Sequence, residues 1–329
     1  MTLRSSFRLI AALVIVLLVT PGADLAGQGT PLPLDRTLPG TLAAGDTARY
    51  TVTTGDDYYL FGEVNQISVD VLVRLVDAGR TEVARFTGPG RGPDRFAGPV
   101  KKAGVYTIEV IPDGKQAGAY QITLIRAEPV AKDPKLLADQ LMAQYDGTTT
   151  PGAVVHVWRD GRVLFSKAYG MANLAYGVPY TTNTRTNIGS TSKQFTAFAI
   201  MLQAQRGLLS LDDDIRKHIP ELPQFDHPIT VRHLITHTSG LREFLNLLGM
   251  SGRRLDHGDW IDRHELIDIV QRQPKLQNVP GAEWNYNNTA FGLAALIVER
   301  TSGKAFPVFM QEDVFGPLGM TRSMVRPSI

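Results

Sequence analysis

The chain has 329 residues and no cysteine, and its 34 basic and 32 acidic residues give a formal net charge of +2. This near-balance of charge gives no reason to expect nucleic acid as a partner. The length is enough for about two domains of roughly 100–200 residues each. The lack of cysteine excludes a thiol nucleophile, a thiolate zinc site, a lipid-modified N-terminal cysteine and a disulfide framework.

The N-terminus has the pattern of a secretory signal peptide. Arg4 and Arg8 precede an unbroken apolar run from Leu9 to Val19, and Pro21-Gly22 follow it. The run is too short to span a bilayer, which needs about 20 apolar residues in a helix. We therefore expect residues 1–27 to be a signal peptide, and the mature protein to be periplasmic or secreted with no stable membrane span. An uncleaved anchor is the alternative, because no clean A-x-A cleavage site is present.

Residues 28–128 are predicted to form a β-sandwich accessory domain. The segments Ser68–Val76, Val105–Ile111 and Tyr120–Ile125 alternate or run apolar, and turn-forming residues separate them. A two-residue apolar period marks half-buried strands, and several short strands at this spacing favour a sandwich or jelly roll. On this rhythm, and on patches such as Gly104-Val105-Tyr106, the stretch loosely resembles the pre-peptidase C-terminal modules of exported bacterial hydrolases.

The second half of the chain reads as α+β. After a linker at 129–134, Asp133 and Pro134 suit the N-cap and first position of a helix running to about Tyr145. Two strands over 152–169 are joined by Asp160-Gly161, a strong hairpin signal. Later apolar patterns predict helices over about 191–205, 230–236, 262–272 and 288–301.

The segment Asn187–Thr196 contains the pattern S-x-x-K. A serine hydroxyl is a poor nucleophile until a neighbouring group accepts its proton. At the start of a helix, the spacing i, i+3 places Lys193 one turn from Ser190 on the same face. The following residues are apolar nearly all round and predict a buried helix. Burial disfavours the charged ammonium, so a neutral or proton-sharing lysine is the expected base. The pattern alone also fits an ordinary helix start with Ser190 as cap and Lys193 in solvent.

Further motifs follow in a fixed order and decide between these alternatives. Through them the chain resembles, from about 135 to 323, the serine β-lactamase-related family of class C β-lactamases, DD-peptidases and esterases. The resemblance implies an N-terminal all-β sandwich followed by an α+β serine β-lactamase/DD-peptidase-like domain over 135–329. The motifs are the hairpin, Ile188–Thr196, Gly207–Asp213, Thr230–Gly240 and Gly316–Met320.

The family's second motif, Y-x-N, matches Tyr286-Asn287-Asn288. The resemblance implies that Tyr286 lies beside Ser190 and Lys193, takes a proton during acylation and returns it to the leaving group. A phenol needs nearby positive charge to act as a base near neutral pH, and Lys193 could supply that charge. The resemblance also implies that Asn288 hydrogen-bonds the lysine and the substrate's amide carbonyl.

The family's third element, a K-T-G or H-x-G triplet, does not occur after Tyr286. In the family this element helps to bind the substrate carboxylate, and its strand supplies one oxyanion-hole N–H. We therefore expect the catalytic domain to be incomplete and the chain as given to be nearly inactive. The hairpin at 152–169 should then expose an unpaired apolar edge.

No metal or organic cofactor is expected. His233 and His237 lie four positions apart, and His264-Glu265 begins like a zinc-protease motif, but position 268 is Asp. We expect a serine hydrolase that acts through a Ser190 acyl-enzyme on a small-molecule or peptidoglycan-derived substrate, whether β-lactam, D-amino-acid peptide or ester. The alternative is a non-catalytic penicillin-recognising or cell-wall-binding protein with the same fold. The sequence leaves the oligomeric state open.

Overall fold

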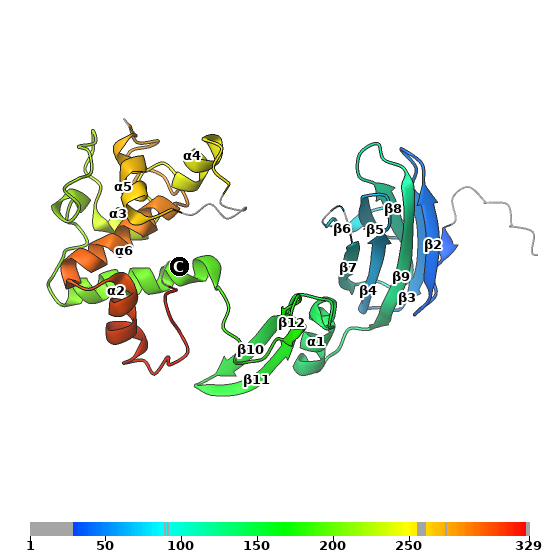
Figure 1. Cartoon of the computed structure of the whole chain (residues 1–329). Coiled ribbons are helices and arrows are strands. Elements are labelled where there is room, and N and C mark those ends of the chain that lie inside the picture. The colour runs from blue at the N-terminus through cyan, green and yellow to red at the C-terminus, as the bar shows by residue number, and fades with distance from the viewer. Residues whose placement is uncertain (1–28, 89, 91, 255–260, 274, 327–329) are drawn as a thin grey trace, which may run out of the picture. The chain divides into compact units, whose positions relative to one another are not determined.

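The computed structural model describes residues 29–326 with the exception of 89, 91, 255–260 and 274. The predicted signal peptide therefore lies outside the described residues. Contacts divide the chain into two compact units, Met1–Thr184 and Arg185–Ile329, which are treated separately below (Figure 1). The predicted domain limits of 28–128, 129–134 and 135–329 stay predictions.

The N-terminal region of the first unit is built from strands in two sheets (Figure 1). The strands predicted over 68–76, 105–111 and 120–125 are confirmed as β5, β8 and β9. The first sheet has the order β1 (Thr30–Pro31), β3 (Ala48–Thr54), β8 (Gly104–Pro112), β5 (Val71–Val76) and β6 (Glu82–Phe86). The second has the order β2 (Thr37–Leu42), β9 (Gly118–Pro129), β4 (Tyr58–Gln66) and β7 (Gly92–Val100).

One buried apolar cluster takes residues from both sheets. The alternation predicted for β8 holds, since Tyr106, Ile108 and Val110 are all buried. A buried hydrogen bond of 2.8 Å joins the hydroxyls of Tyr50 on β3 and Tyr120 on β9. Because each tyrosine belongs to a different sheet, this bond satisfies two polar groups inside the core while it ties the sheets together.

Glu109 lies on the other face of β8 and is buried as well. Its position faces away from the apolar cluster, as the alternation predicts, yet the residue is only 6% exposed. The flanking strands explain this burial, because Arg49 on β3 and Arg74 on β5 lie directly opposite Glu109 and both form ion pairs with it. The carboxylate is therefore covered by two guanidinium groups and is not buried without a partner.

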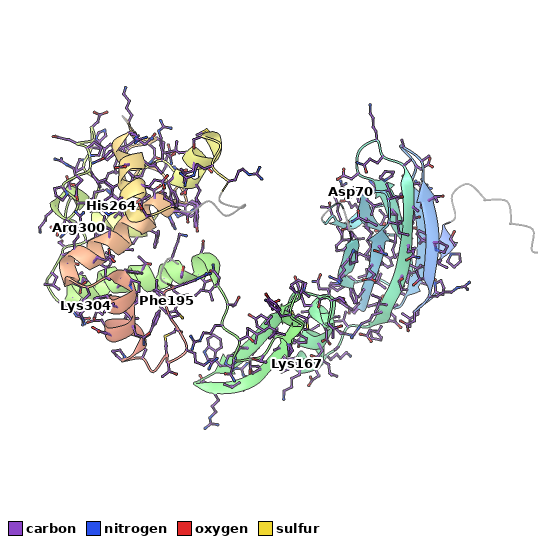
Figure 2. All side chains as sticks on the ribbon, in the orientation of Figure 1. Asp70, Lys167, Phe195, His264, Arg300 and Lys304 are labelled. Carbon is purple, nitrogen blue, oxygen red and sulfur yellow. The ribbon has the colours of Figure 1, made fainter. Side chains whose placement is uncertain are left out.

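The rest of the first unit consists of a short helix and a hairpin. Asp133 caps α1 (Pro134–Leu141) by accepting from the N–H groups of Lys135 and Leu136, as predicted. The helix is shorter than expected, because the chain continues as the 3-10 turn η1 (Ala143–Tyr145). In the hairpin, Lys167, labelled in Figure 2, and Tyr169 both hydrogen-bond Asp139 of α1, at 2.6 and 2.7 Å.

The hairpin itself is confirmed as β10 (Ala153–Arg159) and β11 (Arg162–Tyr169). Asp160 and Gly161 have φ angles of 50° and 72°. Positive φ at both central positions is what a type I′ turn requires. Within the described residues β10 and β11 pair only with each other, and several of their large apolar side chains are exposed. Two short strands follow, β12 (Met171–Asn173) and β13 (Val178–Pro179).

The second unit is helical around a single buried cluster. The four predicted helices are confirmed as α2 (Lys193–Gln205), α3 (Val231–Ile235), α5 (Arg263–Gln271) and α6 (Asn288–Ser302). Not predicted were η2 (Gly189–Ser192), η3 (Ile215–Lys217), α4 (Phe244–Met250), α7 (Phe306–Phe309) and the π-helical turn η5 (Met310–Phe315). Of the helices within the described ranges, none combines the length and the hydropathy that a membrane crossing requires.

Helices α2 and α6 pack against each other (Figure 1). Ala199 and Ile200 of α2 are fully buried, and the buried Gln203 donates to Thr301 of α6 at 3.0 Å. The prediction of a helix buried nearly all round is wrong, because Phe198 and Met201 of α2 are 47% and 48% exposed. One apolar face of α2, which includes Phe198 and Met201, is therefore left exposed by the described residues of this unit.

The side chain of Phe96 occupies the space above a glycine in the second sheet. Gly62 on β4 lies directly opposite Phe96 on β7. A Cβ added at Gly62 would lie 2.2 Å from the Phe96 ring and 2.5 Å from the Thr123 carbonyl oxygen, whereas one added at Gly98 would meet nothing within 4 Å. Glycine in a strand interior often marks such a close approach.

We expect Gly62→Ala to lower the free energy of unfolding of the N-terminal region by about 1–3 kcal/mol, because the added methyl overpacks the core. The control Gly98→Ala, on the neighbouring strand β7, should change it by no more than about 0.5 kcal/mol. Hydrogen exchange of peptides from β4, β7 and β9 across a urea series measures both. Equal stability of the two variants would contradict the packing described for Gly62.

Candidate active site

Ser190 lies in the 3-10 turn η2, immediately before α2. Asn187 supports this turn by accepting from the Gly189 N–H at 2.7 Å, and Gly189 has a φ of 54°. Ser190 is exposed, while Lys193 is half-buried. The Lys193 Nζ donates to the Ser190 Oγ at 3.0 Å, so the i, i+3 spacing brings the two groups together as the sequence indicated. Ser190 is not a helix cap here, and Lys193 is not free in solvent.

Tyr286 and Asn288 reach the same two residues from the start of α6. The Tyr286 hydroxyl donates to the Ser190 Oγ at 2.6 Å. The Lys193 Nζ donates to the Asn288 Oδ1 at 2.7 Å and lies 4.7 Å from the centre of the Tyr286 ring. The structure therefore brings together all four residues that the sequence singled out, from segments about a hundred positions apart.

Asn287 holds the start of α6 in place. Its Oδ1 accepts from the Ala290 N–H at 2.7 Å, which caps the helix. Its Nδ2 donates to the Leu241 carbonyl at 2.7 Å, and the residue is 1% exposed. The middle residue of the Y-x-N motif is therefore structural, and it points into the unit while its two neighbours point at Ser190 and Lys193.

His237 belongs to this site, although the sequence reasoning considered it only for metal binding or structure. Its ring stacks on Tyr286 with centroids 4.6 Å apart, and its Nδ1 accepts from the Asn287 N–H at 3.0 Å. Its backbone carbonyl accepts from the Asn285 N–H at 2.8 Å. His237 has a φ of 60°, in the left-handed region that non-glycine residues seldom adopt.

Glu243 is a second residue of the site that the sequence reasoning missed. One carboxylate oxygen accepts from the Leu245 N–H at 3.2 Å and caps α4, while the other accepts from the backbone N–H of Asn288. No motif in the sequence marks this position. Its role depends on the loop after α3 passing beside the start of α6, which a one-dimensional pattern does not show.

The charges around Tyr286 favour its ionised form. Hydrogen bonding with Lys193, and then with Ser190, lowers the pKa of Tyr286, and the Lys193 charge adds to this while Glu243 opposes it. Burial, and then the charge of Lys193, lowers the pKa of His237. A neutral His237 ring keeps a lone pair on Nδ1 for the Asn287 N–H.

His233, noted in the sequence as one of a possible metal pair, has a structural partner. His233 Nδ1 accepts from the Thr230 N–H at 3.2 Å, in a capping box at the start of α3. Among the described residues there is no group of three or more His, Asp or Glu side chains placed to hold a metal ion.

Comparison with known proteins matches the region that contains this site. The family model described as Beta-lactamase matches residues 138–329. "Penicillin-binding protein 4*" of Bacillus subtilis (strain 168) is 30% identical over 166 residues, which are 50% of this chain and 36% of the relative. A "D-aminopeptidase" of Cereibacter sphaeroides (strain ATCC 17029 / ATH 2.4.9) is 33% identical over 171 residues, which are 52% of this chain and 32% of the relative. The chain therefore spans about a third of the length of these curated relatives.

A solved structure matches a similar share of this chain. The octameric penicillin-binding protein homologue from Pyrococcus abyssi is 32% identical, with a TM-score of 0.47 over 54% of this chain and 41% of that one.

We expect Lys193→Ala to raise the pKa of Tyr286, because Lys193 is the largest cause of its lowering. The control Lys217→Ala, which removes a lysine paired with Asp213, should leave the Tyr286 titration unchanged. NMR titration of protein labelled with ¹³Cζ-tyrosine measures both, and Tyr286→Phe identifies the signal. An unchanged Tyr286 titration in Lys193→Ala would refute the electrostatic coupling.

Proposed function

Because the chain belongs to the beta-lactamase family, we propose that it is a serine hydrolase that acts through an acyl-enzyme on Ser190. One observation carries the proposal. The Ser190 Oγ receives hydrogen bonds from both Lys193, at 3.0 Å, and Tyr286, at 2.6 Å. An exposed hydroxyl held between an amine and a phenol has two groups placed to take its proton, which is the requirement for a serine nucleophile.

In the proposed reaction, the Ser190 oxygen attacks the substrate's carbonyl carbon while its proton passes to Tyr286. The phenolic oxygen must be ionised at that moment, and the hydrogen bonds and the charge of Lys193 favour this state. Collapse of the tetrahedral intermediate breaks the bond to the leaving group, which takes the proton from Tyr286. Water then attacks the acyl carbon of the Ser190 ester and gives a proton to Tyr286. Collapse of this second intermediate breaks the bond to the Ser190 oxygen, which takes that proton back from Tyr286, and the acid is released.

We propose a substrate from the class of D-amino-acid peptides or amides, esters or β-lactams. Support comes from the relatives, among which are proteins named penicillin-binding protein and D-aminopeptidase. Two observations support a role of Asn288 in binding: its Oδ1 contacts Lys193, and its side chain is only half-buried. In this proposal its amide also donates to the carbonyl of the substrate.

We further propose that the protein acts after export, with the strand-rich region serving as a β-sandwich accessory module. The N-terminal pattern of Arg4, Arg8 and the apolar run at 9–19 supports export.

We expect a fluorophosphonate or labelled penicillin probe, given to a complete version of this protein, to attach to Ser190, because this hydroxyl contacts both Lys193 and Tyr286. Intact mass and peptide mapping locate the label. Ser190→Ala should abolish labelling. The control Ser192→Ala should not, because the Ser192 Oγ instead donates to the Gly189 carbonyl at 2.6 Å. Labelling that persists in Ser190→Ala would sink the proposal, and acylation without turnover would favour a penicillin-recognising protein.

We expect Lys193→Ala and Tyr286→Phe each to slow acylation by about 10²-fold or more, the usual scale for a lost acid–base group. The double variant should be little slower than either single one, because the two residues serve one proton transfer. The rates of Ser190 labelling in the wild type, the two single variants and the double variant give the double-mutant cycle. Rates that multiply would mean that Lys193 and Tyr286 act independently.

A further inference from the structure

Glu243 joins the starts of two helices through one carboxylate. Its Oε1 accepts from the Leu245 N–H at 3.2 Å, at the first turn of α4. Its Oε2 accepts from the Asn288 N–H, at the first turn of α6. Both helix starts present unsatisfied N–H groups, which favour a negative side chain. A single carboxylate therefore sets the position of α6 against the loop that follows α3.

This loop holds the start of α6 at three successive residues. The Asn287 side chain donates to the Leu241 carbonyl at 2.7 Å, and the Thr289 hydroxyl donates to the Arg242 carbonyl at 2.7 Å. Between them, the Asn288 backbone is held by Glu243. Among these three contacts, only the one at Asn288 uses a charged group.

The same contact lies one residue from the reacting groups. Asn288 gives its N–H to Glu243 and accepts with its Oδ1 from Lys193 at 2.7 Å. The charge of Glu243 also acts on the site, since it raises the pKa of Tyr286 against the effect of Lys193. The groups that face Tyr286 are thus Ser190 and Lys193 from η2 and α2, and His237 and Glu243 from the segment between α3 and α4.

We propose that Glu243 is a positioning residue for the reaction at Ser190: its carboxylate fixes the backbone that presents Tyr286 and Asn288, and its charge balances that of Lys193. The inference rests on the proposed function. A purely structural role would not depend on the charge of Glu243. The proposed role does, because the charge acts on the proton transfer and a neutral replacement does not reproduce that effect.

The test uses the full chain with Glu243→Gln, Glu243→Asp and Glu243→Ala. The control is Glu312→Gln, which removes an equal charge that pairs with Lys304. Two quantities are measured: the rate of Ser190 labelling across pH, and the titration of Tyr286 by ¹³Cζ-tyrosine NMR. Glu243→Gln should slow labelling about tenfold or more, since small misplacement of reacting groups is costly. Without the negative charge Tyr286 ionises more easily, so the acid limb and the Tyr286 titration should both move to lower pH.

Glu243→Asp keeps the charge and should keep the acid limb, with a rate between those of the wild type and Glu243→Ala. Glu312→Gln should behave like the wild type. If the Tyr286 titration is unchanged in Glu243→Gln while Ser190 is still labelled, the role proposed for Glu243 is overturned, but the proposed function is not. Absence of labelling at Ser190 in the wild type overturns the proposed function instead, and the NMR titration still decides the effect of the Glu243 charge. Because Glu243→Gln carries the test, loss of folding in Glu243→Ala does not weaken it.

Discussion

Asn287 caps α6 with its Oδ1 and, from the same amide, donates to the Leu241 carbonyl. The arrangement at Ser190 depends on this buried side chain. α6 begins where Asn287 ends the extended backbone before it, with φ and ψ of −145° and 117°. That change of direction places Tyr286 before the cap and Asn288 after it, so Tyr286 reaches Ser190 in the turn η2 and Asn288 reaches Lys193 at the start of α2. If the helix began one residue later, neither side chain could keep its contact with Ser190 or Lys193.

The packing of α2 on α6 supplies the other half of this geometry. Gln203 of α2 bonds Thr301 at the far end of α6, and Phe195 of α2, labelled in Figure 2, meets Phe315 of η5 edge-to-face at 5.6 Å between ring centroids. Two packed helices therefore bring Ser190 and Lys193 together with Tyr286 and Asn288 from a distant part of the chain. The start of α6 is also bonded to the loop after α3, through Asn287 to Leu241 and Thr289 to Arg242.

The spacing of S-x-x-K pointed to Ser190 and Lys193, because positions i and i+3 lie on one helical face. Tyr286 and Asn288 were predicted only through the resemblance to the serine β-lactamase-related family, whose Y-x-N motif they match. The sequence could not predict His237 or Glu243. Their contacts depend on how the backbone after α3 turns, through a left-handed residue, to run beside the start of α6. The same limit explains Glu109, whose burial depends on strand register that brings Arg49 and Arg74 opposite to it. Helix α2 shows the opposite error. Its apolar composition predicted burial on all sides, but composition does not tell which faces of a helix pack against a neighbour.

His237 meets two demands that few amino acids meet together. Its backbone requires a positive φ, which asparagine and glycine tolerate better than most residues, while its side chain must be a flat ring with a hydrogen-bond acceptor. Asparagine would suit the backbone but cannot stack on Tyr286, and phenylalanine would stack but cannot accept from Asn287. These two demands limit which side chain the position can hold. A variant that exchanged His237 would give up the ring contact with Tyr286, the acceptor for the Asn287 N–H, or the left-handed backbone that directs the chain toward the start of α6.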